Sequence, residues 1–165
     1  MRYAATPIIL LGLAGACSGH VGSTSSQATA LQAAATSMQS DLTALRGKGT
    51  GMVKVTPTAE DRSGPGTMDV RGTVDVRGAA PRTSFTVLRR VDLAADGVCT
   101  SDTWLTLPPP NAQGFTTSPD GAGALPFHIS RGAPFLDGVR FDVQWRLAGD
   151  DGSMLESDCF TVTVR

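Results

Sequence analysis

Apolar and polar residues alternate one by one over most of the chain after residue 52, and this pattern restricts the fold more than any other feature. The clearest case is the segment 139–147. Its odd positions are all apolar and its even positions are all polar, namely Val139, Phe141, Val143, Trp145 and Leu147 against Arg140, Asp142, Gln144 and Arg146. Successive side chains of a β-strand point to opposite faces, so we expect a strand with one buried face here.

Further segments share this period. They are 52–55, then 68–78 with its two similar copies 68–72 and 74–78, then 83–91, 103–107, 115–117, 123–129 and 154–164. Four Asp-Gly pairs, which favour tight turns, begin at Asp96, Asp120, Asp137 and Asp151. Seven or eight short strands over residues 52–165 predict a mainly β protein with a single antiparallel β-sandwich, immunoglobulin-like by analogy.

The segment before this domain has a different period. Between residues 27 and 46 the apolar residues recur at spacings of three and four, namely Ala28, Leu31, Ala35, Met38, Leu42 and Leu45. This predicts a short amphipathic helix over 27–46, with Gly47 at its end and a glycine-rich linker over 47–51. Such a helix either forms a coiled coil or binds a partner, or it packs on its own domain or acts as a spacer. In either case the rest of the chain is expected to fold without it.

The first residues have the composition of an export signal. A short basic start, Met1-Arg2-Tyr3, precedes an apolar run from Ala4 to Leu13 that is too short to span a bilayer. The sequence Leu13-Ala14-Gly15-Ala16-Cys17 resembles the lipobox of bacterial lipoproteins. The resemblance implies that residues 1–16 are a signal peptide and that Cys17 carries lipid. The composition of residues 18–26, which is rich in Ser, Gly and Thr, predicts a flexible tether over 17–26. The alternative is an ordinary secretory signal with an unmodified Cys17.

Two cysteines, Cys99 and Cys159, remain for the domain. An even pair in an exported domain is expected to form a disulfide. Cys159 has the opposite parity to the apolar residues Phe160, Val162 and Val164. The bridge is therefore expected at the periphery, where it would clip the loop 92–102 onto the last strand, unless a β-bulge near Asp158 reverses the parity.

Composition limits the possible chemistry. The chain has 14 basic and 15 acidic residues, and such a balance argues against nucleic acid as a partner. His128 is the only histidine of the domain and is expected to face away from the core. One histidine does not make a usual zinc or copper site. The pairs Asp92/Asp96 and Asp150/Asp151 are expected to form turns, with a calcium site as the alternative.

No catalytic motif is found, so we expect no enzymatic activity, catalytic residue, metal site or cofactor. The sequence favours a non-enzymatic lipoprotein, anchored through Cys17 to a membrane of a bacterial cell envelope on its extracytoplasmic side. Its domain would have a structural role or bind a protein partner. The alternative is a module that binds a small ligand or a carbohydrate.

Overall fold

A computed structural model describes residues 37–60, 67–108, 114–131 and 138–164. The predicted signal peptide, Cys17, the tether and residues 27–36 of the predicted helix lie outside the described residues. Within the described ranges the regular structure is all β-strand. No described helix is long and apolar enough to cross a membrane.

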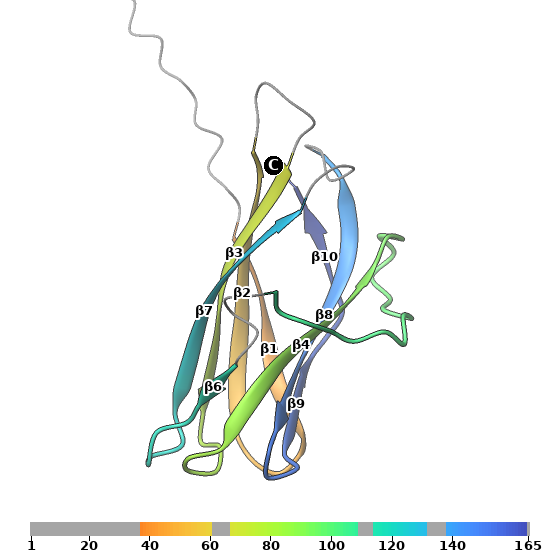
Figure 1. Cartoon of the computed structure of the whole chain (residues 1–165). Helices are drawn as coiled ribbons and strands as arrows, with labels where there is room; N and C mark the ends of the chain where they lie inside the picture. Colours follow the sequence, from red (N-terminus) through yellow and green to blue (C-terminus); the bar gives the residue numbers. More distant parts are fainter. Residues whose placement is uncertain (1–36, 61–66, 109–113, 132–137, 165) are drawn as a thin grey trace, which may run out of the picture. The chain divides into compact units, whose positions relative to one another are not determined.

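The strands form one antiparallel sheet that curls into a half-barrel (Figure 1). They are β1 (Met38–Arg46), β2 (Thr50–Glu60), β3 (Thr67–Arg77), β4 (Ser84–Asp92), β5 (Leu105–Thr106), β6 (Phe115–Thr116), β7 (Gly123–Arg131), β8 (Arg140–Gly149), β9 (Met154–Ser157) and β10 (Phe160–Thr163). Their order across the sheet is β5-β4-β8-β9-β1-β2-β3-β7. In addition, β10 pairs with β8, and β6 pairs with β4.

The sheet is continuous, in contrast to the two separate packed sheets of the predicted sandwich. The continuity comes from β9, which pairs with β8 on one side and with β1 on the other. The mainly β, antiparallel character is confirmed. The opposite walls of the half-barrel share one core, because Phe127 of β7 and Trp145 of β8 lie with ring centroids 5.0 Å apart.

The helix predicted over 27–46 is wrong for its last nine residues, which form β1. In β1, Leu42 is buried, while Met38 and Ser40 on the same face are half-buried. Residues Met38 to Thr43 pair with β2, and Leu42 to Arg46 pair with β9. Pairing on both edges outweighs the weak local helical pattern, as tertiary context commonly does.

The predicted linker over 47–51 is also replaced by regular structure. Gly47 and Gly49 have positive φ values of 78° and 115° and turn the chain between β1 and β2, which begins at Thr50. Glycine adopts such values without the steric cost that other residues have. The glycines that suggested a helix end and a linker are therefore the turn of a β-hairpin.

The final return strand is interrupted. Arg146 lies opposite Glu156, but Val143 lies opposite Phe160, so the register with β8 shifts by one residue between β9 and β10. Ser157 compensates at the break, because its Oγ accepts a hydrogen bond from the backbone N–H of Trp145 at 2.9 Å. The extra residue lies near Asp158, where the sequence left a β-bulge open, but it does not change the parity of Cys159 relative to Val162 and Val164.

Candidate functional site

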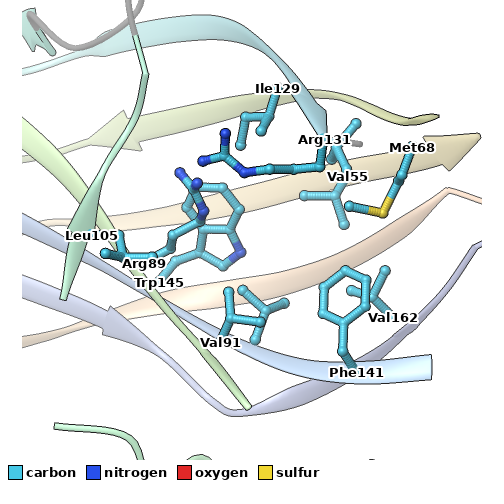
Figure 2. A pocket seen from close by; sticks show the side chains of 12 residues that line it. Val55, Met68, Arg89, Val91, Leu105, Ile129, Arg131, Phe141, Trp145 and Val162 are labelled. Carbon is cyan, nitrogen blue, oxygen red and sulfur yellow. The ribbon is translucent and has the colours of Figure 1, made fainter. Parts of the chain in front are cut away.

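The half-barrel holds an apolar pocket of about 160 Å³ (Figure 2). Strands from both of its walls contribute to the lining. The lining side chains are Val55, Met68, Val70, Arg89, Val91, Leu105, Ile129, Arg131, Phe141, Val143, Trp145 and Val162. Pockets for drug-sized ligands have volumes of roughly 300–1,000 Å³, whereas a cavity of about 150 Å³ holds benzene. This pocket therefore has room for one compact apolar group.

Two arginines stand at inward-facing positions on strands from opposite ends of the sheet. Arg89 continues the buried face of β4 that includes Phe85 and Val87, and it is only 5% exposed. Arg131 ends the inward face of β7 after Ile129 and is exposed. Figure 2 shows the two side chains extending toward each other.

Neither guanidinium has a carboxylate partner among the described residues. Arg89 donates from Nη1 to the backbone carbonyl of Thr106 at 3.3 Å. Burial, and to a smaller extent the like charge of Arg131, lowers the pKa of Arg89 from 12.5 to about 10. Arg89 therefore remains cationic at neutral pH, and no described carboxylate pairs with either guanidinium group at the pocket.

Trp145 adds a third donor to the pocket. Its side chain is 2% exposed, and among the described residues no acceptor lies within hydrogen-bond distance of its Nε1. Figure 2 shows the indole nitrogen on the side of the ring that faces the middle of the pocket. A buried N–H without a partner costs about 1–3 kcal/mol, so an acceptor placed in this pocket would recover that loss.

The polar groups of the lining can donate hydrogen bonds but cannot act as a base or a nucleophile. They are one indole and two guanidinium groups, and the other lining side chains are aliphatic, Phe or Met. Carboxylate, imidazole, thiol or hydroxyl groups are the usual catalytic side chains. The arrangement suits binding of an apolar group that carries hydrogen-bond acceptors.

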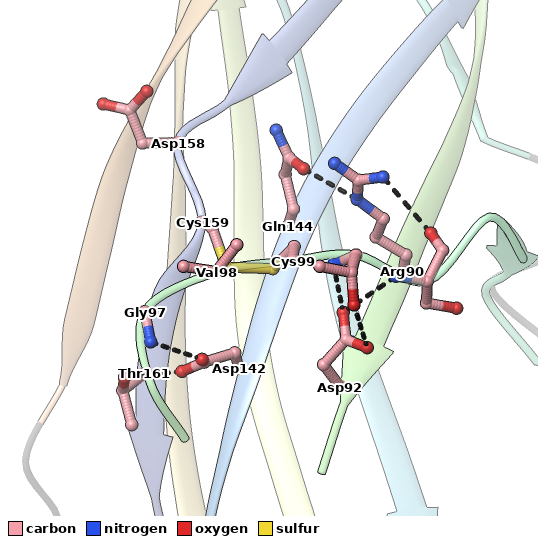
Figure 3. The surroundings of a disulfide bond; sticks show 12 residues. Arg90, Asp92, Gly97, Val98, Cys99, Asp142, Gln144, Asp158, Cys159 and Thr161 are labelled. Atoms are coloured by element: carbon pink, nitrogen blue, oxygen red, sulfur yellow. Dashed lines mark hydrogen bonds between the residues drawn. A yellow bond between two sulfur atoms is a disulfide. The ribbon is translucent and has the colours of Figure 1, made fainter. Parts of the chain in front are cut away.

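The predicted disulfide between Cys99 and Cys159 is present, with Cα atoms 5.6 Å apart (Figure 3). It lies on the outer side of β8 and joins the segment after β4 to the break between β9 and β10. We call residues 93–104 the strap. Cys159 is outside because it has the parity of Thr161, whereas Val162 points into the core.

Asp142 of β8 binds the strap through a hydrogen bond. Its carboxylate accepts the backbone N–H of Gly97 at 2.6 Å and the hydroxyl of Thr161 at 2.5 Å. Burial alone would raise the pKa of Asp142, but these hydrogen bonds outweigh it and hold the pKa below its ordinary value. Asp142 therefore has a structural role beneath the strap, and it is fully buried.

The strap ends at Trp104, whose ring packs on the outer face of the sheet. The guanidinium carbon of Arg146 lies 3.8 Å from the ring centroid, and that of Arg90 lies 5.1 Å away. Arg146 is also paired with Glu156 at 2.7 Å. These contacts hold the strap against β4 and β8 without contributing to the pocket.

Of the aspartates considered for calcium, Asp96 and Asp151 accept backbone hydrogen bonds within turns, whereas Asp92 and Asp150 accept them from residues farther away in the chain. Asp92 accepts the backbone N–H groups of Thr100 and Ser101 at 2.9 and 3.1 Å. Asp151 accepts the N–H of Ser153 at 2.9 Å. Within the described ranges, no cluster of His, Cys, Asp and Glu side chains is suited to hold a metal ion.

His128 points outward, as expected, and its Nε2 lies 3.0 Å from Oδ1 of Asp69. This pair lies on the other face of the sheet from the pocket. Of the other predicted site residues, Cys17 lies outside the described residues.

Arg89, Arg131 and Trp145 were not predicted to lie together at a site. A signal for them was present, because both arginines have the parity of apolar neighbours in their strands. A charged residue at a core position is rare unless it is paired. That rule would have marked both positions, although only the curl of the sheet brings them together.

Comparisons with known proteins give no relative. No protein-family model, curated protein or solved structure matches this chain.

Proposed function

We propose that this chain is a non-enzymatic protein of a bacterial cell envelope, lipid-anchored through Cys17, whose half-barrel binds a small apolar ligand. The single observation that carries the binding function is the apolar pocket with Trp145 Nε1 buried and unpartnered within the described part. A closed core would have filled this space, because protein interiors are close-packed. The pocket supports ligand binding, which was the alternative, over the structural or protein-binding role that the sequence favoured.

Export is supported by the disulfide, because such bonds persist in oxidising compartments outside the cytosol. The anchor rests on the resemblance of residues 13–17 to a lipobox. The absence of catalytic activity is supported by the pocket lining, whose polar groups only donate hydrogen bonds.

Thermal unfolding with a neutral compact probe, cyclohexanol, tests the binding function. A ligand that binds only the native state stabilises it, by about 1.4 kcal/mol at roughly ten times its Kd. For a domain of this size the midpoint should rise by a few degrees, about 2–6 °C. Val91→Phe, which places a larger side chain in the pocket, should abolish the rise, whereas Leu93→Phe should not, because Leu93 is 73% exposed.

A protein-binding role is the second candidate, favoured by β7. Within the described part of the sheet, β7 pairs only with β3, so its other edge forms no ladder with a described strand, although β6 lies beside its start. Open strand edges accept an added strand from a partner. Crosslinking from Ser130 to one specific envelope protein, unaffected by Val91→Phe, would favour this role over ligand binding.

A further inference from the structure

The polar groups of the pocket define the ligand more closely than its size does. Arg89, Arg131 and Trp145 are all hydrogen-bond donors, and among the described side chains that line the same space the only acceptor is the weakly accepting thioether of Met68. A neutral apolar ligand would leave two cations at the pocket without an anion. A ligand that brings a negative charge would relieve both the like-charge contact and the desolvation of Arg89.

We propose that the pocket binds a small organic anion, a carboxylate on a compact alicyclic or aromatic body. The inference rests on the proposed ligand-binding function and assigns the chemical class of its ligand. The apolar body occupies the part of the pocket lined by Val55, Val143 and Val162, and the carboxylate lies between the guanidinium groups of Arg89 and Arg131.

Geometry and charge both support this placement. The arginines come from β4 and β7, which lie near the two ends of the strand order, and Arg131 is exposed, so an anion can approach the pair from solvent past Arg131. Guanidinium groups present paired donors that match the two oxygens of a carboxylate. Arg89 uses only one donor on the protein, toward Thr106, within the described residues. Its remaining donors and its charge are available to a ligand.

Trp145 provides an independent argument. Its Nε1 is buried, has no described acceptor and lies on the pocket side of the ring. A ligand with an acceptor oxygen within reach of Nε1 would satisfy this donor, whereas a hydrocarbon would leave it unpaired. Two charged donors and one neutral donor in an apolar pocket thus select for oxygen-bearing anions and against cations.

Fluorescence of Trp145 gives a direct readout of binding. The chain has two tryptophans, and Trp104 stacks on Arg146 outside the pocket. The full chain carrying Trp104→Phe therefore reports from Trp145 alone. It is titrated with three probes of the same shape, namely cyclohexanecarboxylate, cyclohexanecarboxamide and cyclohexylmethylamine. We expect the carboxylate to bind about tenfold or more tightly than the amide, and the amine to bind least.

Variants then locate the charge. Arg89→Met and Arg131→Gln should each reduce the preference for the carboxylate over the amide toward one. Arg131 is exposed, so its replacement keeps the test valid even if Arg89→Met fails to fold. Arg71→Gln is the matched control, because Arg71 is an exposed arginine of β3 that does not line the pocket. It should leave the preference unchanged.

The outcomes separate the two levels of the proposal. Equal binding of carboxylate and amide, or an equal effect of Arg71→Gln and Arg131→Gln, overturns the anion inference but leaves ligand binding intact. No change in Trp145 emission with any probe, together with no thermal shift with cyclohexanol, overturns the binding function itself.

Discussion

Arg89 occupies a position that an apolar residue would fill at less cost to the fold. It lies between Val87 and Val91 on the inner face of β4, almost fully buried and close to another cation. A buried charge without an opposite charge opposes folding. A group that opposes folding is commonly kept for function, and binding of an anion is the function that this charge suits.

This yields the first prediction, on stability. Arg89→Met keeps the length of the side chain and removes the charge, so the free energy of unfolding should rise, by about 1 kcal/mol or more. Chemical denaturation at neutral pH measures the change, with Arg71→Gln expected to lie within roughly 0.5 kcal/mol of the parent. A clear loss of stability in Arg89→Met would show that the hydrogen bond to Thr106 makes Arg89 a structural residue.

The second prediction concerns Asp142. Its pKa is lowered in the folded state, so it stabilises the fold above about pH 4, the ordinary pKa of an aspartate, and this stability is lost as the pH falls through the folded value. Asp142→Asn has one oxygen for two donors, Gly97 and Thr161, and should cost about 2 kcal/mol at pH 7. Urea unfolding at several pH values should show this difference shrinking below about pH 4. A difference that stays constant with pH would contradict the role of the charge.

At the residue scale, parity in the sequence predicted which side chains face inward in the long strands, such as Val143 and Leu147, and it placed His128 outside. It also contained the two inward arginines, but not their proximity. Arg89 and Arg131 are 42 positions apart in the chain, and only long-range pairing decides that their strands border the same opening. The period of a sequence indicates which side chains share a face of a strand, whereas contacts across the half-barrel depend on how the sheet curls.

Among the elements, β1 has a role opposite to the one that its sequence suggested. It pairs with β2 on one edge and β9 on the other, so the sheet depends on it for continuity. We therefore expect a chain that starts at Gly49 to be unfolded or aggregated, while a chain that starts at Ser37 keeps cooperative unfolding. Circular dichroism and thermal melts of the two chains provide the comparison. A cooperative melt of the shorter chain would mean that β2 and β9 can close without β1.

The strap is a second element whose role can be tested. Cys99→Ser combined with Cys159→Ser removes a link that closes a long loop, with a sequence separation of 60. The chain-entropy model gives a loss of roughly 4 kcal/mol. Because the bridge lies on the outer face, hydrogen exchange should increase in the strap and at the break near Asp158, and the centre of β8 should remain protected. Loss of protection throughout β8 would mean that the bridge belongs to the core.

The strands were predictable to different degrees for a physical reason. The strands β4, β7 and β8 each have one buried apolar face and one polar face, so apolar and polar residues alternate clearly in their sequences. In β1 only Leu42 is fully buried, and the other positions mix polar residues with Met38, Ala44 and Leu45. Apolar and polar residues therefore alternate little in β1. Its hydrogen bonds to β2 and β9, which its own sequence does not indicate, make it a strand.

For the whole molecule, the sequence predicted antiparallel β-structure and the disulfide but not the half-barrel. Turn residues indicate where strands end, and alternation indicates which face is buried. Neither signal indicates which strands pair along their edges. The long strand β8 pairs with β10 through residues Arg140 to Val143 and with β9 through Arg146 to Ala148. This division keeps the sheet continuous from β8 through β9 to β1.

The last prediction concerns the localisation of the protein. If Cys17 carries lipid, mass spectrometry of the mature amino terminus will show a diacylglyceryl-modified cysteine at the first position, and Cys17→Ser will release the protein from the membrane fraction. Stable anchoring requires more than one acyl chain, because a single chain holds a protein only reversibly. Cleavage at another position with an unmodified Cys17 would leave an exported protein without an anchor.

The position of β1 also has a mechanical consequence. It is the first described strand, and its neighbours on both edges run antiparallel to it. Tension transmitted along the backbone from the amino-terminal side therefore loads two rows of hydrogen bonds in shear, which must fail together. A terminal strand at the rim of the sheet would instead peel away one bond at a time. Rupture under force depends on the unfolding rate rather than on equilibrium stability, so this placement protects the fold against pulling at its amino-terminal end.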